Sequence, residues 1–129
     1  MILVDSNFLI ALFISNDALH DKAAQIANEV YNQDKAITDL FISETITLII
    51  AKSNAKASKE VYHHILKHFK VIEVDRTIYN ETINTVLKYR GILSFADSLG
   101  VKVMKEKGMN KIASFDTDFD IVQGIQRIY

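Results

Sequence analysis

The sequence predicts an α/β fold in which helices cover both faces of a central parallel sheet. Short apolar runs typical of buried strands alternate with longer segments whose apolar residues recur at helical spacing. Proline is absent, so the breaks between segments lie at glycine, asparagine, aspartate and serine. Such alternation is typical of parallel strands joined by right-handed helical crossovers.

The first third of the chain predicts one strand and two helices. Residues 1–5 are an apolar run that ends in an acid, and residues 6–14 continue as a short buried helix. Asn16 and Asp17 then break the chain. Residues 18–32 predict an amphipathic helix, because their apolar side chains have helical spacing: Leu19, Ala23, Ile26, Ala27, Val30 and Tyr31.

The middle third predicts two strands around a pair of helices. Residues 35–38 form a short strand, and residues 40–53 form a helix that we expect to be largely buried, although its β-branched residues favour strands. Residues 56–69 are an amphipathic helix, and residues 71–74 are a strand. One face of the amphipathic helix carries Val61, Ile65 and Phe69.

The last third predicts two helices and two strands. Residues 76–90 and 94–107 are helices, and each is followed by a glycine that can end it. Residues 111–114 and 125–128 are the final strands. With no linker, repeat or low-complexity segment, we expect residues 1–129 to form a single domain.

Composition narrows the function classes. The chain has 129 residues, 49% hydrophobic and 24% charged, with a net charge of -1, which favours an ordinary globular protein over a disordered one. The near-zero charge argues against a dedicated nucleic-acid binder, but it permits an enzyme with a local basic rim. Cysteine is absent, so a metal site must use oxygen or imidazole ligands.

No targeting or membrane segment is visible. The apolar run 8–14 has no basic residues before it, and it is well short of the roughly 20 residues that span a bilayer. We therefore expect a cytoplasmic protein with no membrane partner.

Four acids fall where segments of such a sheet should converge: Asp5, Glu44, Asp97 and Asp116. Asp5 ends the first strand, Asp116 follows the run 111–115, and the other two lie near the starts of predicted helices. Residues just past the carboxyl ends of parallel strands line the ligand crevice. Crowded carboxylates repel one another unless a cation neutralises them. We therefore expect a hard metal ion, Mg²⁺ or Mn²⁺.

Each acid taken alone has a simpler interpretation. Asp5 is a favourable helix cap, Asp97 favours a helix dipole, Asp116 suits a turn, and Glu44 suits a solvent-facing helix position. Ionised carboxylates are rarely buried without partners, however, and these four recur in apolar surroundings. Metal coordination explains all four positions together.

Each of the four acids lies in a short motif, and the motifs follow one another along the chain: Val4-Asp5-Ser6-Asn7, Ile42-Ser43-Glu44-Thr45, Leu93-Ser94-Phe95-Ala96-Asp97 and Ala113-Ser114-Phe115-Asp116-Thr117-Asp118-Phe119. Together they resemble the PIN-domain ribonucleases, and most of all the small VapC-type toxins of prokaryotic toxin–antitoxin pairs. The resemblance covers essentially the whole chain.

The resemblance implies a three-layer α/β/α sandwich around a parallel sheet. It implies that the metal site and catalytic centre are formed by four acids: Asp5, Glu44, Asp97 and Asp116. Asn7 and Ser114 match polar positions that support the site, and Asp118 matches a frequent accessory acid at the metal. Many members of the family are more basic than this chain.

The function implied is a metal-dependent endoribonuclease that cleaves RNA phosphodiester bonds as the toxin of a toxin–antitoxin pair. A homodimer and an antitoxin protein are the partners implied. Two alternatives stay open: a PIN-type RNA-processing nuclease without an antitoxin, and a non-catalytic metal-binding α/β domain such as a receiver-like module.

A zinc site on the histidines is a weaker candidate. His64 and His68 have the i, i+4 spacing that can bind a metal on one helix face. Lysines crowd the same helix, so we expect a solvated or RNA-facing polar face there instead.

Overall fold

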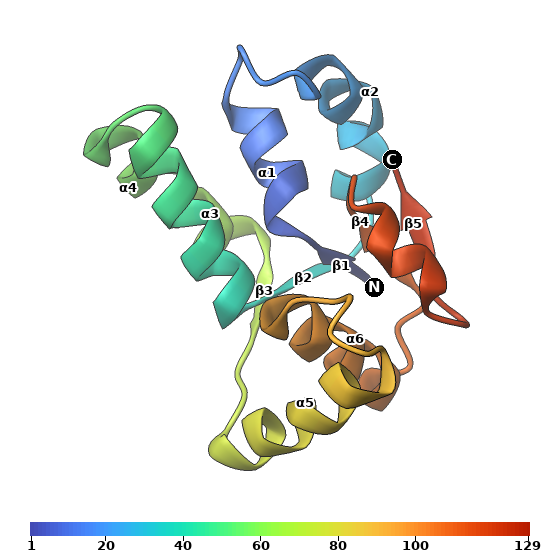
Figure 1. The fold of residues 1–129 in the computed structure, drawn as a ribbon. Coiled ribbons are helices and arrows are strands. Elements are labelled where there is room, and N and C mark those ends of the chain that lie inside the picture. The colour runs from blue at the N-terminus through green and yellow to red at the C-terminus, as the bar shows by residue number, and fades with distance from the viewer.

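The computed structural model describes residues 1–129 and has a five-stranded, fully parallel sheet at its centre (Figure 1). The strand order is β3-β2-β1-β4-β5. The strands are β1 (Ile2–Val4), β2 (Lys35–Thr38), β3 (Lys70–Ile72), β4 (Lys111–Ala113) and β5 (Gln126–Ile128). The predicted α/β fold is therefore confirmed, with strands of only three or four residues.

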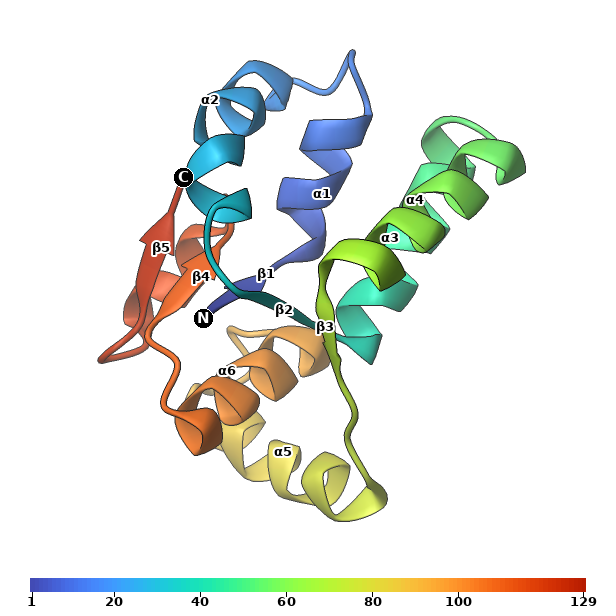
Figure 2. The ribbon, with the colours of Figure 1, turned by 180° about the vertical axis from the view of Figure 1, so that it is seen from behind.

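Six helices and one 3₁₀ turn connect these strands. They are α1 (Ser6–Phe13), α2 (His20–Tyr31), α3 (Asp39–Lys52), α4 (Ala55–His68), α5 (Arg76–Lys88), α6 (Phe95–Lys107) and η1 (Thr117–Ile121). Both views show α5 and α6 on the opposite side of the sheet from α1 and α2, and α3 and α4 form a hairpin beside α1 (Figures 1 and 2). The sandwich that the family resemblance implied is confirmed.

The order of the strands creates a switch point between β1 and β4. The chain leaves β1 towards β2 on one side and leaves β4 towards β5 on the other. The two strands pair in parallel register, with Val4 opposite Ala113, and the amide of Asp5 donates to the carbonyl of Ala113 at 3.0 Å. Ligands of open α/β sheets bind in the crevice outside the carboxyl ends of strands at such a point.

Helix caps set where the helices on this edge begin. The hydroxyl of Thr38 accepts from the amide of Phe41 and starts α3 directly after β2. The hydroxyl of Ser94 accepts from the amide of Asp97 and starts α6. Gly108 ends α6 with φ of 68°, a left-handed conformation that a side chain would strain.

The core brings α6 very close to the sheet. Twenty-eight buried apolar residues form one cluster that spans both faces. A Cβ at Gly100 would lie 3.1 Å from the ring of Phe41 and 3.2 Å from Leu3, so a larger residue would have to push these two side chains aside. No helix is both long and apolar enough to cross a membrane.

Three details differ from the sequence predictions. β3 covers residues 70–72 rather than 71–74, because its partner β2 ends at Thr38, which pairs with Ile72. The turn η1 was not predicted, since five residues carry no clear periodicity. The prediction that α3 is largely buried was wrong: only Phe41, Thr45 and Ile49 are buried on it, while Ile50 is 50% exposed.

Candidate metal centre

Asp5 lies at the base of the switch point and is buried. Its Oδ1 accepts from the amide of Ser6 at 2.7 Å, and its Oδ2 accepts from the hydroxyl of Ser114 at 2.6 Å. Burial raises the pKa of Asp5 to about 6, the two hydrogen bonds act against this, and the charges of Glu44 and Asp116 raise it further. The sequence therefore places a poorly solvated carboxylate among other acids.

Ser114 connects Asp5 to the segment that carries Asp116. Its hydroxyl oxygen also accepts from the amide of Asp116 at 3.0 Å, and the Asp116 side chain accepts from the amide of Asp118 at 2.9 Å. Asn7 accepts from the amide of Phe115 at 3.1 Å with its side-chain oxygen. Asn7 and Ser114 thus hold the backbone between β4 and η1.

Asp97 enters from the first turn of α6, on the other face of the sheet. Burial raises its pKa to about 7, and the charges of Asp5 and Asp116 add to the shift, against hydrogen bonds from Ser94. Asp97 therefore lies within the electrostatic influence of both strand-end acids.

Glu44 enters from α3 and is the least satisfied of the acids. Its Oε1 is buried and has no hydrogen-bond partner. Burial and then the charge of Asp97 raise its pKa. A buried acceptor without a partner costs free energy, which a bound cation or donor at Oε1 would recover.

The charges of the four acids act on one another, although their side chains do not converge on one point. Asp5 is affected by Glu44 and Asp116, Glu44 by Asp97, and Asp97 by Asp5 and Asp116. No three acidic or histidine side chains converge enough to hold a metal ion as they stand. Carboxylates with this spacing repel one another when ionised, and a bound cation would neutralise them. The all-oxygen donors suit Mg²⁺ or Mn²⁺.

The remaining acids of the last loop have different surroundings. Asp118 is half-buried, next to Asp116 along η1. Asp120 is exposed and forms an ion pair with Arg127 of β5 at 2.8 Å. Sequence reasoning missed this pair, because Arg127 lies in a short strand with no motif around it.

His68 is exposed, as expected for a solvated face, but His64 is not. His64 is half-buried, with Nε2 at 2.7 Å from the hydroxyl of Tyr31 and its ring edge-on to Phe13. Burial lowers its pKa, and the charges of His68 and two lysines lower it further. His64 belongs to an aromatic cluster that joins α4 to α1 and α2, whereas His63 and His68 are exposed.

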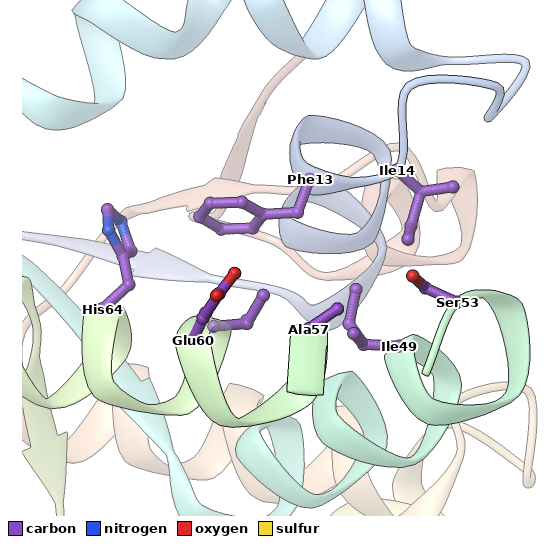
Figure 3. A pocket seen from close by; sticks show the side chains of 8 residues that line it. Phe13, Ile14, Ile49, Ser53, Ala57, Glu60 and His64 are labelled. Carbon is purple, nitrogen blue, oxygen red and sulfur yellow. The ribbon is translucent and has the colours of Figure 1, made fainter. Parts of the chain in front are cut away.

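An apolar groove of about 320 Å³ lies between α1 and the α3–α4 hairpin (Figure 3). Phe13 projects into it from α1, opposite Glu60 and His64 of α4. Its other lining residues are Ile14, Ile49, Ser53, Ala57 and Val61. On the α3 side the groove is lined by Ile49 and Ser53, which follow Glu44 by five and nine residues.

Comparison with known proteins gives consistent results. Residues 2–125 match the PIN domain family. Two relatives, a VapC ribonuclease of Mycobacterium bovis and ribonuclease VapC13 of Mycobacterium tuberculosis, are each 27% identical over 99% of this chain and 99% of their own length.

Solved structures share the fold. Mycobacterium tuberculosis VapC20, a sarcin-ricin loop cleaving toxin, superposes with a TM-score of 0.83 at 22% identity, covering 94% of each chain. A toxin–antitoxin complex from Klebsiella pneumoniae gives 0.73 at 20% identity, covering 98% of this chain and 96% of that one.

Proposed function

The chain belongs to the PIN domain family, and on that premise we propose that it is a metal-dependent endoribonuclease, the toxin of a toxin–antitoxin pair. The single observation that carries the proposal is a set of acids whose charges act on one another. The pKa values of Asp5, Glu44 and Asp97 are raised, the charge of Asp116 contributes to two of these shifts, and Glu44 has a buried oxygen without a partner. The relatives named as VapC ribonucleases support the same activity.

We assign the binding of Mg²⁺ or Mn²⁺ to the four acids of the crevice: Asp5, Glu44, Asp97 and Asp116. Asp118 stands at the margin as an accessory acid. When bound, the ion supplies an activated water and stabilises the oxyanion of an in-line phosphodiester displacement. Glu44 offers the free Oε1, while Ser114 orients Asp5 so that its carboxylate keeps one fixed rotamer.

Protons compete with the cation at this site. With pKa values of about 6 for Asp5 and about 7 for Asp97, the ion-free carboxyls hold protons close to neutral pH. Metal ligands must be deprotonated, so metal affinity rises as these protons leave. Activity should therefore increase with pH through this range.

The groove between α1 and α4 supports an antitoxin partner. It presents an apolar floor with one acid, Glu60, and this chemistry suits an amphipathic segment that also carries a basic residue. From there the segment would reach Glu44 along α3. An arginine placed among the carboxylates would form bidentate pairs with them and exclude both metal and RNA.

A face of α5 supports a homodimer. Tyr79, Ile83 and Leu87 follow one another at four-residue intervals, and Ile83 and Leu87 are 49% and 70% exposed. The ring of Phe95 stacks on Tyr79 and extends the same apolar surface to the start of α6. An exposed apolar patch of this kind suits a twofold contact that would place two acidic sites on one assembly.

The proposal is tested by incubating the purified protein with a single-stranded RNA in Mn²⁺, in Mg²⁺ and in EDTA. Cleavage in metal, its absence in EDTA, and its absence in the Asp97→Asn variant would support the nuclease. Co-expression with the neighbouring reading frame separates a toxin from an RNA-processing nuclease that has no antitoxin.

A further inference from the structure

One guanidinium ties the last strand to both ends of the loop that carries Asp116. Arg127 donates from Nε to Oδ1 of Asp120 at 2.8 Å and from Nη2 to Oδ2 at 3.1 Å. It also donates from Nη1 to the carbonyl of Ser114 at 3.2 Å. The segment from Ser114 to Asp120 therefore closes on Arg127 at its two ends.

The pair differs from an ordinary surface ion pair in where its members lie. The side chain of Arg127 is only 5% exposed, whereas that of Asp120 is 56% exposed. The guanidinium also stacks over the ring of Tyr129 at 4.0 Å. The ring of Tyr129 contacts one face of the planar guanidinium, and the carboxylate of Asp120 binds its edge in a bidentate pair. Together these contacts fix the orientation of the guanidinium, and the ammonium group of a lysine cannot make the same contacts.

Ser114 connects Arg127 to the acids of the crevice through hydrogen bonds. Its carbonyl accepts from Arg127, while its hydroxyl donates to Asp5 and accepts from the amide of Asp116. The turn η1, which follows Asp116 and contains Asp118 and Asp120, is a short 3₁₀ helix, whose own hydrogen bonds are weak. Its position therefore depends on what holds its ends.

We propose that Arg127 is a positioning residue: with Asp120 it forms a clamp that fixes the loop carrying Asp116 and Asp118 at the acidic centre. Its effect on catalysis rests on the proposed nuclease function, but its effect on the loop does not. Arg127 acts through Ser114 and Asp120 and leaves the binding of RNA to other groups.

Two conservative variants test the clamp. Arg127→Lys keeps the positive charge but loses the bidentate guanidinium, and Asp120→Asn keeps the size of the side chain but loses its negative charge. Glu106→Gln is the matched control, because it breaks an exposed ion pair with Lys102 on α6. Hydrogen exchange is measured in the ion-free protein, and kcat and KM for RNA are measured in Mn²⁺.

The amides of Asp116 and Asp118 should exchange roughly tenfold faster in both clamp variants. Those of Leu99 and Ile112 in the core should keep their wild-type rates. In both variants kcat should fall by about tenfold with KM little changed, and the double variant should be no worse than Arg127→Lys alone. Glu106→Gln should match the wild type throughout.

The outcomes separate this inference from the nuclease itself. If the wild type does not cleave RNA, the proposed function fails, and the exchange rates of Asp116 and Asp118 still decide whether the clamp exists. Wild-type exchange at these two amides in both variants overturns the clamp. Faster exchange through the whole core makes Arg127 a general stabiliser, and a raised KM at unchanged kcat makes it an RNA contact. Either result overturns the positioning role.

Discussion

The hydroxyl of Ser114 lies 2.6 Å from Oδ2 of Asp5, although the two residues are 109 positions apart in the chain. The bond crosses from the end of β4 to the end of β1, and both groups are buried. It lowers the pKa of a carboxyl that burial otherwise raises. Ser114 therefore favours the ionised form of Asp5, which is the form that binds a cation.

The Ser114→Ala variant should raise the pKa of Asp5 above its value of about 6, because the donor that stabilises its charge is gone. It also leaves the amide of Asp116 without an acceptor, so we expect a loss of roughly 1–3 kcal/mol in the free energy of unfolding. Urea denaturation measures the loss. The control is Ser98→Ala, because the hydroxyl of Ser98 is buried with no partner; that change should be neutral or stabilising, and equal losses for both variants would contradict the role of Ser114.

The free energy of unfolding of the ion-free protein should fall as the pH rises through the raised pKa values of the acids in the crevice. The pKa of Asp97 is about 7 in the folded chain against an ordinary 3.8, so the folded state holds the proton more tightly. The contribution of this group is fully present below pH 3.8 and is lost as pH rises through about 7. The difference in unfolding free energy between the wild type and Asp97→Asn, measured in EDTA across this range, isolates the effect. A difference independent of pH would count against a shared acidic crevice.

Added Mn²⁺ or Mg²⁺ should raise the melting temperature of the wild type, since a ligand that binds only the folded state stabilises it by mass action. Asp5→Asn and Asp97→Asn should lose this increase and lose RNA cleavage, while their ion-free melting temperatures stay equal or rise because repulsion is relieved. Calorimetry with and without metal checks both effects. Asp21→Asn, on the exposed face of α2, is the control and should behave as the wild type.

The proposed homodimer uses the apolar face of α5. A glutamate in place of Leu87, which is 70% exposed in the monomer, should halve the mass measured by light scattering at micromolar concentration without unfolding the chain. Ile121→Glu changes an apolar residue that is 45% exposed on η1, and it should leave the dimer intact. A wild type that already scatters as a monomer would rule out this assembly.

The groove between α1 and α4 makes a separate prediction about the antitoxin. Ala57→Arg adds a bulky cation to its lining, so the chain should no longer co-purify with the product of the neighbouring frame, while metal-dependent melting and RNA cleavage persist. Lys59→Glu, on the exposed side of the same helix, serves as the control. If both variants capture the partner normally, the groove is not its binding site.

Much of the architecture follows from local sequence pattern, and the failures have physical causes. Helical periodicity, with Ser94 as the start of the later helix, placed α3 and α6 within one or two residues. β3 was misplaced because residues beyond Ile72 suit a strand but have no partner to pair with. His64 was expected on a solvated face because Phe13 and Tyr31, which enclose it, come from other helices.

The candidate site divides in the same way. Acids at strand ends can be identified from the sequence, since a parallel sheet gathers them at one edge, and their role as metal ligands stays a prediction. The unpaired oxygen of Glu44 and the clamp of Arg127 on Asp120 depend on packing between distant segments. No local pattern records such contacts.

The pairing of β1 with β4 also determines when the protein acquires its acidic crevice during synthesis. Asp5 is made early, but Asp116 and the strand before it are translated more than a hundred residues later. A ribosome-bound chain that has not yet released β4 carries only part of the crevice. Contacts so distant in sequence form slowly as well as late. A nascent chain that has not yet released β4 therefore lacks Asp116 and cannot complete the crevice, so any activity that needs all four acids begins only once synthesis is nearly finished.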